Sequence, residues 1–330
     1  MKTRQLSNSI KVGCIGYGAM GLSEFYGKID DNKSLKLLEN LLENGITFID
    51  TADMYGNGHN ERLIGHFLAK LNNSDRHKFT ISTKCGIDRN LQDGYSRSIN
   101  NSPEYIKKCC DESLTRLGID SIDLFYLHRI DQNVQIEESI GCLKDLVKQG
   151  KIKHIGLCEA SASTLKKAHS IYPITALQSE YSLWTRDVEN EILPTAKDLS
   201  ISFIPYSPLG RGFLTGKYVN NDCFNSTDFR KNNERFLQEN LEHNIQILNF
   251  LAPIAKKYDA TTGQIALAWL LSQYDKLIPI PGTKNIHYLI ENSKAANITI
   301  SATDIESLNN FKFNVKGHRY NTEGMKGINV

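Results

Sequence analysis

Short apolar runs alternate with stretches of helical periodicity along most of this chain. The run at 122–127 has the length of a buried strand, whereas Ile136, Ile140, Leu143 and Val147 recur at the spacing of one helix face. The alternation continues through eight candidate strands, and the pattern predicts them at residues 11–15, 46–49, 79–83, 122–127, 152–157, 175–178, 201–204 and 277–280.

Polar residues mark the ends of several predicted helices. Asn60 is placed to cap a helix over residues 61–71. Thr261 and Gln264 have the spacing of a capping box ahead of a helix over residues 265–271. These boundaries support an order in which strands are separated mostly by helices.

This order predicts the fold. Each strand can return parallel to the previous one through a right-handed helical crossover. Eight such units and 330 residues fit one (β/α)8 barrel of the TIM type, and the composition has no linker-like break. We therefore predict a single α/β domain over residues 1–330, with an open doubly wound sheet plus an appended domain as the alternative.

Two segments depart from the repeat. Residues 209–240, after the seventh strand, are rich in Asn, Asp and Arg with scattered Phe, and a long loop of this kind is typical of a lid or binding loop. The polar tail at residues 312–330 is expected either to cover one mouth of the barrel or to be disordered.

The composition argues against several classes of function. The 39 basic and 37 acidic residues are interspersed and give a formal charge of +2, which does not favour binding to nucleic acid. The apolar stretches are too short to cross a membrane, and the N-terminus lacks the apolar segment of a secretory signal. Seven cysteines without metal-ligand spacing favour reduced thiols, no metal centre and a cytoplasmic location.

Four polar residues lie at the ends of predicted strands. Asp50, Lys84 and His128 each follow an apolar run directly, and Tyr55 lies in the loop after Asp50. Because chemistry in a parallel barrel gathers at the carboxyl ends of the strands, we expect the four side chains to converge. Taken singly, each residue has an ordinary structural explanation, such as a turn cap or a surface charge. Together, a carboxylate, a phenol, an ammonium and an imidazole indicate a proton-transfer site.

The segments around these residues resemble motifs of the aldo-keto reductase family. The resemblance covers nearly the whole chain, and the motifs occur in the family's order at 48–56 (FIDTADMYG), 82–84 (STK), 124–128 (LFYLH), 204–210 (IPYSPLG) and 280–284 (IPGTK). Residues 23–27 and 207–212 are further similar to the branch near perakine reductase and pyridoxal reductase. The resemblance implies an enzyme that reduces small-molecule aldehydes or ketones to alcohols with NADPH. It does not indicate an oligomeric state.

The resemblance also implies the roles of the four residues. Tyr55 gives a proton to the carbonyl oxygen while NADPH supplies a hydride to carbon. A phenol has an ordinary pKa of about 10, and the nearby ammonium of Lys84 lowers that pKa and makes the proton easier to give. Asp50 holds Lys84 in place, and His128 donates a hydrogen bond that orients the substrate. This chemistry requires no metal.

Binding residues follow from the same resemblance. Tyr206 is expected to stack on the nicotinamide and Lys284 to meet the 2′-phosphate, with the loop at 209–240 covering the pyrophosphate. The implied cofactor residues are Cys158, Gln178, Tyr206, Ser207, Leu209, Arg211, Gly282, Thr283, Lys284, Glu291 and Asn292, and the implied substrate pocket is Tyr26, Met54, Arg129 and Trp184. Cys158 replaces the serine usual in relatives, and Asn285 replaces an arginine, so we expect looser nicotinamide anchoring and leave NADH as an alternative cofactor.

Two other functions are consistent with parts of the sequence. Residues 16–21 have the G-x-G-x-x-G spacing of a Rossmann-type dehydrogenase, but residues 23–30 lack the periodicity of the helix that must follow. The acidic residue expected some twenty positions later is also missing, so we expect these glycines to form a tight first loop instead. A cofactor-binding regulatory subunit similar to potassium-channel β subunits is the second alternative, and steady turnover of an aldehyde would distinguish the enzyme from it.

Overall fold

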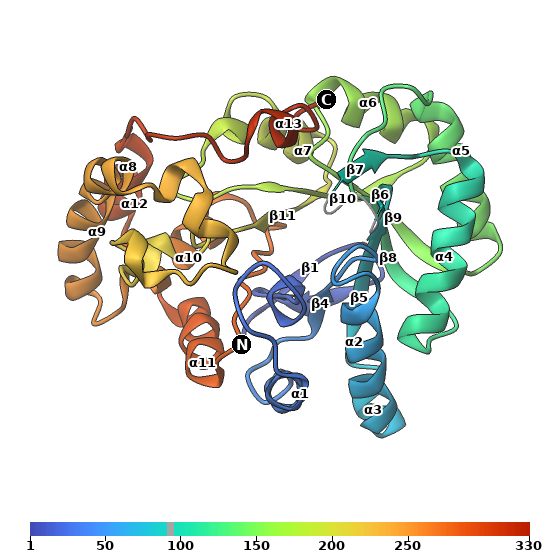
Figure 1. The fold of residues 1–330 in the computed structure, drawn as a ribbon, viewed down its shortest axis with the longest axis horizontal. Helices are drawn as coiled ribbons and strands as arrows, with labels where there is room; N and C mark the ends of the chain where they lie inside the picture. Colours follow the sequence, from blue (N-terminus) through green and yellow to red (C-terminus); the bar gives the residue numbers. More distant parts are fainter. Residues whose placement is uncertain (91–95) are drawn as a thin grey trace.

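Parallel strands form the centre of the molecule (Figure 1). The structure is a computed structural model that describes residues 1–90 and 96–330. Seven strands form one sheet in the order β11-β10-β9-β8-β5-β4-β3, and all neighbouring pairs are parallel. Their bounds are β3 (Tyr17–Gly18), β4 (Phe48–Asp50), β5 (Thr80–Cys85), β8 (Ile122–Leu127), β9 (Ile152–Cys158), β10 (Ile174–Glu180) and β11 (Ser202–Tyr206).

An eighth extended segment at residues 277–280 closes the sheet into a barrel. On one side, the Ile278 amide donates to the Phe203 carbonyl at 2.9 Å. On the other side, the Gly16 amide donates to the Pro279 carbonyl at 2.9 Å. Pro279 has no N–H of its own, which is one reason the pairing here is too short to form a regular strand. The predicted (β/α)8 barrel, including its last strand position, is confirmed.

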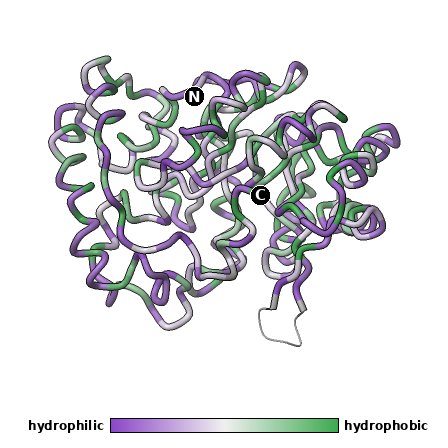
Figure 2. Tube along the Cα trace, turned by 90° about the horizontal axis from the view of Figure 1, so that it is seen from above, coloured by the Kyte–Doolittle hydropathy of each residue, from purple (hydrophilic) through white to green (hydrophobic). Residues whose placement is uncertain are grey.

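Helices surround the barrel, and hydrophobic and hydrophilic positions alternate along them (Figures 1 and 2). The face of α5 that carries Ile136, Ile140 and Leu143 is buried, as its periodicity predicts. The helices are α1 (Asp31–Glu39), α2 (His59–Lys70), α3 (Asn73–Arg76), α4 (Pro103–Leu117), α5 (Ile136–Lys148), α6 (Ala162–Ile171), α7 (Ile192–Asp198), α8 (Gln238–Asn244), α9 (Gln246–Lys257), α10 (Thr262–Gln273), α11 (Ile286–Lys294), α12 (Ala302–Asn310) and α13 (Thr322–Met325). Among the helices of residues 1–90 and 96–330, none is both long and apolar enough to span a bilayer.

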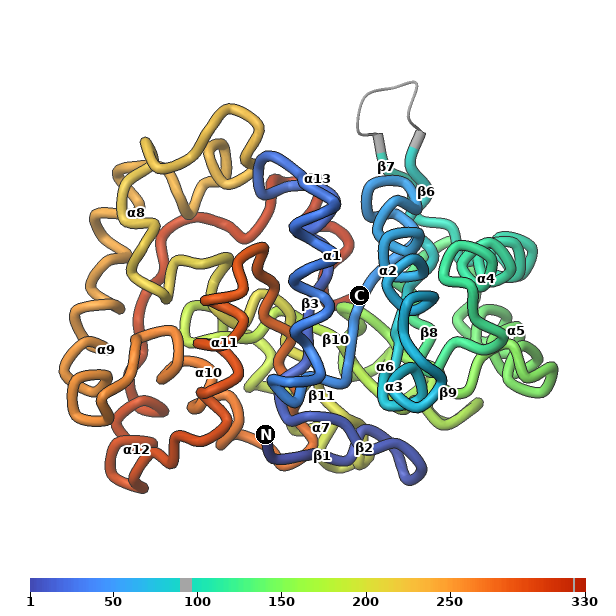
Figure 3. The backbone as a smooth tube through the Cα atoms, turned by 90° about the horizontal axis from the view of Figure 1, so that it is seen from below, coloured from blue at the N-terminus to red at the C-terminus, as the bar shows by residue number. Residues whose placement is uncertain are grey.

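The prediction that residues 11–15 form the first strand of the barrel is wrong. Residues Lys11–Gly13 form β2, which pairs antiparallel with β1 (Thr3–Gln5), and the first barrel strand is β3 (Figure 3). This hairpin bonds to the starts of barrel strands, since the Ser202 hydroxyl donates to the Leu6 carbonyl at 2.8 Å. Leu6 and Val12 pack with the apolar residues inside the barrel. The apolar run therefore plugs the bottom of the barrel rather than forming one of its strands.

The predicted start of α2 is also wrong. Gly58 stands at the N-cap, and Asn60 is fully buried inside the helix. The Asn60 side chain accepts from the Thr51 hydroxyl at 2.6 Å and donates to the Ala19 carbonyl at 2.9 Å. Asn60 thus joins two loops at the top of the barrel. The capping box of Thr261 and Gln264, in contrast, is confirmed.

The glycine motif at residues 16–21 serves closure of the barrel. A Cβ on Gly18 would lie 2.7 Å from the Ile280 carbonyl oxygen, and one on Gly282 would lie 2.6 Å from the Gly18 oxygen. Only glycine permits backbones to approach this closely. A single 3-10 turn, η1 (Met20–Leu22), overlaps the end of the motif, and the next helix begins only at Asp31, so the helix that a dinucleotide-binding loop requires is missing after residues 16–21. The Rossmann interpretation is therefore excluded.

Two extensions border the upper mouth of the barrel. The loop after β11 contains the 3-10 turns η4 (Phe213–Thr215), η5 (Asn221–Cys223), η6 (Phe229–Asn232) and η7 (Glu234–Phe236) before α8. It reaches the first loop of the barrel, where the Phe229 amide donates to the Phe25 carbonyl at 3.0 Å. The sequence did not indicate the hairpin of β6 (Ile87–Asn90) and β7 (Ser96–Ile99), which follows β5.

The C-terminal tail is docked on the barrel. Its last residue, Val330, accepts a hydrogen bond from the Ser161 amide at 3.0 Å, and α13 lies within it. The tail was expected either to cover one mouth of the barrel or to be disordered, and in the structure it covers the barrel.

Candidate active site

Three neighbouring strands bring the four predicted catalytic residues together. Asp50 ends β4, Lys84 lies near the end of β5, and His128 follows β8 directly. These strands are hydrogen-bonded neighbours in the order β4-β5-β8, so their carboxyl ends point to the same mouth of the barrel. Tyr55 comes from the loop after β4.

Lys84 is the centre of the cluster. Its side chain is fully buried, and Nζ donates to Asp50 Oδ2 at 2.5 Å and to the Thr51 carbonyl at 2.7 Å. The third contact of Nζ is the Tyr55 hydroxyl at 3.4 Å. The other carboxylate oxygen, Asp50 Oδ1, accepts from the Ser82 hydroxyl at 2.8 Å. The ammonium is therefore held between a carboxylate and a phenol.

Burial and the neighbouring charges have opposite effects on the pKa of Lys84. Burial lowers this pKa, but Asp50 and then Tyr55 outweigh it, so the pKa lies above its ordinary value. Lys84 thus carries its charge at neutral pH. For Tyr55 burial is the larger effect and raises the pKa, while the Lys84 ammonium lowers it. Tyr55 is therefore protonated at neutral pH, which is the form that can give a proton.

His128 faces Tyr55 across the same space. The two rings are 5.7 Å apart between centroids and nearly perpendicular, at 82°. Burial, Lys84 and Arg129 hold the pKa of His128 well below its ordinary value, so its imidazole is neutral. Nδ1 is buried and has no hydrogen-bond partner among the described residues. A neutral imidazole with a vacant ring nitrogen is able to hydrogen-bond to a ligand.

Two of the expected nicotinamide residues lie beside this cluster. Gln178 Nε2 donates to Asp50 Oδ1 at 2.9 Å, so Gln178 supports the carboxylate directly. Cys158 ends β9 and is fully buried, with a thiol pKa that burial raises to about 12. This thiol is therefore neutral and has only a weak capacity to hydrogen-bond.

The expected pyrophosphate segment has an unusual backbone. Ser207 and Arg211 have positive φ angles of 48° and 55°, which is uncommon for residues other than glycine. Gly210 and Gly212 are also left-handed, at 57° and 93°. Three of these left-handed residues are consecutive, and the amides of Gly210 and Gly212 donate to the carbonyls of Ser207 and Leu209, so the segment is a tight turn. Strain of this kind concentrates at ligand sites, and here it lies directly after β11.

Arg211 and Leu209 are more enclosed than the sequence indicated. Leu209 is buried in the main core. Arg211 donates to Glu180 Oε2 at 3.1 Å and to the Arg319 carbonyl at 2.6 Å. In this structure Arg211 therefore ties the loop after β11 to the C-terminal tail.

The expected adenosine residues lie around α11 and the loop before it. Lys284 Nζ donates to the carbonyls of Tyr26 and Lys28, and burial lowers its pKa. Glu291 accepts from the Thr261 hydroxyl at 3.0 Å. Thr283 and Gly282 precede the helix, and Asn292 is buried within it.

The expected substrate residues fall into two groups. Met54 packs in one small cluster with Tyr55, and Arg129 donates to the His128 carbonyl at 2.7 Å. Tyr26 lies under the Arg230 guanidinium, 4.9 Å from its ring centroid. Trp184 instead stacks on Phe213, with ring centroids 4.2 Å apart, and lines a separate cavity.

Tyr320 was missed by the sequence reasoning. Its hydroxyl lies 3.0 Å from the Tyr206 hydroxyl, and the Arg211 guanidinium lies 4.6 Å from the centroid of its ring. Nothing in the tail sequence marks this position, because the contact depends on how the tail is laid over the barrel. Ser82 was also missed as a support for Asp50, although it lies two residues before Lys84 on the same strand.

Among residues 1–90 and 96–330, no group of His, Cys, Asp and Glu is arranged to hold a metal. The residues present do fit a nicotinamide dinucleotide. They provide a strained loop after β11, a vacant imidazole nitrogen and a protonated phenol beside a buried ammonium, all at the carboxyl ends of the strands.

Comparisons with known proteins show the family of the chain. The model of the aldo/keto reductase family matches residues 14–312. A probable aldo-keto reductase from Glycine max is 44% identical over 305 residues, which are 92% of this chain and 86% of that protein. An NADP(+) aldo-keto reductase from Schizosaccharomyces pombe is 40% identical, over 93% of this chain and 90% of its own. The structure of a glycerol dehydrogenase from Gluconobacter oxydans matches with a TM-score of 0.84 at 26% identity, covering 93% of this chain and 94% of the other.

Proposed function

Because this chain belongs to the aldo/keto reductase family, we propose that it reduces aldehydes or ketones to alcohols with NADPH and that Tyr55 gives the proton. The observation that carries the proposal is the position of Lys84 Nζ, which lies 2.5 Å from Asp50 Oδ2 and 3.4 Å from the Tyr55 hydroxyl. A phenol whose oxygen accepts a hydrogen bond from a buried ammonium can give its proton to a substrate oxygen, because the ammonium stabilises the phenolate that remains.

Each residue of the cluster has a distinct task. Asp50 neutralises and orients Lys84, and it is itself held by Ser82 and Gln178. His128, neutral because burial and nearby cations lower its pKa, donates a hydrogen bond to the carbonyl oxygen from one ring nitrogen. Tyr55 then protonates that oxygen. When bound, NADPH supplies the hydride that the carbonyl carbon accepts.

The cofactor is assigned to the loop after β11 and to the segment before α11. The pyrophosphate is assigned to the turn at residues 207–212, where Ser207, Gly210, Arg211 and Gly212 are left-handed, and the nicotinamide ring to Tyr206. Lys284 is the cation that we assign to the 2′-phosphate. Its Nζ already donates to two backbone carbonyls, so only one N–H bond is left for that contact. Together with Asn285 in place of an arginine, this leaves room for use of NADH.

The Tyr55→Phe variant tests the proposal. Removing one hydroxyl takes away the proton donor but leaves the barrel and the cofactor loop, so turnover should fall by about 10²- to 10⁴-fold while NADPH still binds. The assay follows NADPH absorbance with a panel of carbonyl compounds, and NADPH binding is measured separately by fluorescence. Tyr172→Phe, at the end of α6, is the matched control and should keep wild-type turnover. Near-normal turnover of Tyr55→Phe would remove the proposed acid.

We propose the branch near perakine reductase and pyridoxal reductase for the substrate class, on the basis of residues 23–27 and 207–212. The panel should therefore include pyridoxal, methylglyoxal and nitrobenzaldehyde. If pyridoxal is turned over no better than the small aldehydes, this branch assignment fails while the family activity stands. Tight NADPH binding without turnover of any compound would instead favour the regulatory-subunit alternative.

We further propose a cytoplasmic location. All seven cysteines lie in the described residues and none is in a disulfide, and six of them are buried. Reduced, buried thiols of this kind are typical of a reducing compartment.

A further inference from the structure

The hairpin of β6 and β7 places two arginines opposite each other. Arg89 and Arg97 are directly paired in the register of the two strands, so their side chains lie on the same face. Like charges in this arrangement destabilise a strand pair, and a negative group nearby offsets the repulsion. Arg89 donates to the Met54 carbonyl at 2.8 Å, and the Arg97 guanidinium lies 5.5 Å from the centroid of the Phe25 ring. The hairpin therefore presents positive charge to the loops at the catalytic mouth.

Arg129 adds a third guanidinium beside the same mouth. It follows His128 directly and is partly buried, and a Cβ on Gly327 of the tail would lie 3.4 Å from Arg129 Cδ. Burial, Lys84, Arg129 and Arg97 together hold the pKa of His128 well below its ordinary value, so both arginines act on the imidazole. Two positive charges therefore lie close to the residue that is proposed to orient the substrate carbonyl.

The guanidinium of Arg129 has an open edge. Its Nη1 donates to the His128 carbonyl at 2.7 Å, and Nε and Nη2 make no hydrogen bond within residues 1–90 and 96–330. Neither of these two nitrogens belongs to the buried atoms of those residues that lack a partner, so both reach solvent. The Nε–H and one N–H of Nη2 point the same way and form the fork that binds a carboxylate bidentately. This fork is therefore available to a ligand.

Neither Arg97 nor Arg129 forms an ion pair with a residue that the structure describes. Glu24 is the carboxylate beside the hairpin, and it lies 2.8 Å from Arg89, where the two side chains are 12% and 7% exposed. Burial and the charge of Arg89 lower the pKa of Arg97, whereas Glu24 raises it. The charge of Glu24 is thus already used by Arg89, and the other two guanidinium groups have no carboxylate of their own.

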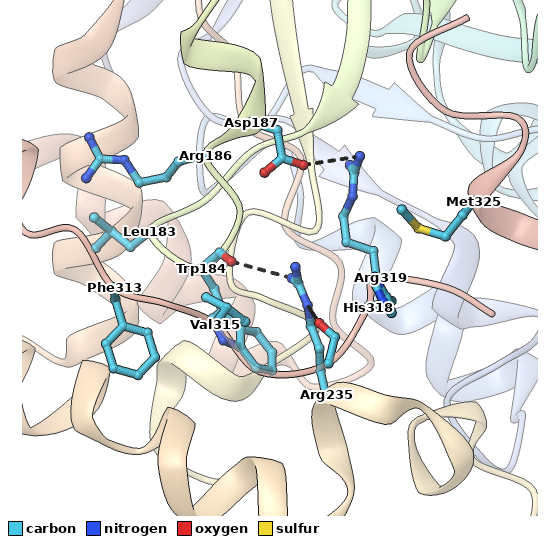
Figure 4. Close-up of a pocket in the computed structure, with 11 residues that line it drawn as sticks. Leu183, Trp184, Arg186, Asp187, Arg235, Phe313, Val315, His318, Arg319 and Met325 are labelled. Atoms are coloured by element: carbon cyan, nitrogen blue, oxygen red, sulfur yellow. Dashed lines mark hydrogen bonds and ion pairs between the residues drawn. The ribbon is translucent and has the colours of Figure 1, made fainter. Parts of the chain in front are cut away.

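The next carboxylates are paired with Arg319. Burial lowers the pKa of Arg129, and Glu159 is among the groups that raise it, but Glu159 lies 3.7 Å from Arg319. Asp187 lies 3.5 Å from Arg319. Arg319 lines a separate cavity of about 540 Å³ under the C-terminal tail, which neither Arg97 nor Arg129 lines (Figure 4). Even with this group included, one positive charge is left over, since four guanidinium groups (Arg89, Arg97, Arg129 and Arg319) face three carboxylates (Glu24, Glu159 and Asp187).

We propose that the carbonyl substrate of this protein carries a carboxylate, which Arg129 binds through Nε and Nη2 and which Arg97 attracts. A carboxylate offers two oxygens in the plane of the guanidinium fork, and its single negative charge equals the excess. A phosphate carries about two negative charges at neutral pH and matches that excess less well. The inference rests on the proposed function, because His128 is the residue that places the carbonyl oxygen beside Tyr55.

4-Formylbenzoate and its methyl ester test the proposal, because they share the ring and the aldehyde and differ in charge. Turnover is followed by NADPH absorbance. We expect kcat/KM for the acid to exceed that for the ester by about tenfold or more, mainly through a lower KM, because hydrogen bonds between charged groups are strong. An equal or higher kcat/KM for the ester would overturn the inference and leave the proposed function intact.

Binding is measured apart from turnover, by calorimetric titration of the protein loaded with NADP⁺, which has no hydride to give. The acid should bind more tightly than the ester by about tenfold or more. If the acid is preferred in this titration but neither compound is reduced by NADPH, the carboxylate site stands and the proposed reductase function fails.

Variants locate the carboxylate. Arg129→Gln should lower the acid-to-ester ratio by about tenfold in both assays, whereas a change that only disturbs His128 would weaken both compounds alike and keep the ratio. Arg97→Gln, at an exposed position of the hairpin, is the second variant and should lower the ratio severalfold. Lys70→Gln removes one positive charge from the last turn of α2, at the opposite end of the barrel, and should leave the ratio as in the wild type.

Two results from these variants would contradict the proposal. If the preference for the acid persists in both Arg129→Gln and Arg97→Gln, the carboxylate is bound elsewhere. If the two variants weaken NADPH in fluorescence titrations by as much as they weaken the acid, the arginines serve the cofactor rather than the substrate.

Discussion

Replacement of Asp50 by Asn isolates the electrostatic core of the site. The change is nearly isosteric, and the side chain can still accept from Ser82 or Gln178 through its amide oxygen. What it removes is the negative charge 2.5 Å from Lys84 Nζ. Lys84 is fully buried, so the variant leaves an ammonium without a counter-ion inside the barrel.

The expected loss of stability is large at neutral pH. Removing one partner of a buried ion pair typically costs about 3–5 kcal/mol, because the remaining charge is desolvated and unpaired. The upper part of that range applies only if the Thr51 carbonyl, which accepts from Lys84 at 2.7 Å, gives little compensation. We therefore expect the free energy of unfolding to fall by about 3 kcal/mol at about pH 7.

The loss should depend on pH in a definite direction. In the wild type, Asp50 and Tyr55 raise the pKa of Lys84 above its unfolded value, so the contribution of the pair is complete below that value and is lost only at higher pH. In the variant, burial is the main remaining effect and lowers this pKa. As pH rises through the lowered pKa, Lys84 becomes neutral and the penalty disappears. The difference in the free energy of unfolding between the wild type and Asp50→Asn should therefore become smaller from about pH 7 to about pH 10.

Urea unfolding followed by circular dichroism measures both quantities, with Ser82→Ala as the control. Ser82→Ala removes one hydrogen bond to the same carboxylate but no charge, and should cost about 1 kcal/mol at every pH in that range. If the loss of unfolding free energy in Asp50→Asn is no larger than in Ser82→Ala, or stays constant with pH, the view that Asp50 stabilises a charged Lys84 is refuted.

Three further predictions follow from the geometry. Lys284→Ala should weaken NADPH far more than NADH in fluorescence titrations, and equal losses would mean that Lys284 does not contact the 2′-phosphate. Tyr320→Phe removes the hydroxyl that meets Tyr206 and should weaken NADPH by about 2- to 10-fold, whereas an unchanged affinity would show that the tail contact does not support the cofactor site. Gly156→Ala places a Cβ 2.3 Å from a buried tyrosine ring and should cost about 1–3 kcal/mol on urea unfolding, while Gly141→Ala, in open space on α5, should not destabilise.

The sequence was sufficient for the barrel because its signal is local and repeated. Apolar runs such as 122–127 and the helical stripe of α5 each specify an element from neighbouring residues alone. A parallel order then follows from the alternation itself. The convergence of Asp50, Lys84 and His128 was predictable for the same reason, since each residue follows its own strand and the strands are neighbours.

Local pattern failed where partners distant in the sequence decide the structure. The run at 11–15 has the composition of a barrel strand, but Thr3–Gln5 pairs with it and turns it into a plug. Asn60 has the chemistry of a cap, yet contacts with Thr51 and Ala19 draw it inside.

The sequence by itself determined the architecture and the identities of the catalytic groups, because both follow from the spacing of residues that are close together in the chain. Only the tertiary structure decided what each group experiences: which form of Tyr55 and His128 is present, how Gln178 supports Asp50, and where the tail places Tyr320 and Arg319. Burial and charge act through space rather than along the chain, so these properties exist only once the distant segments have packed together.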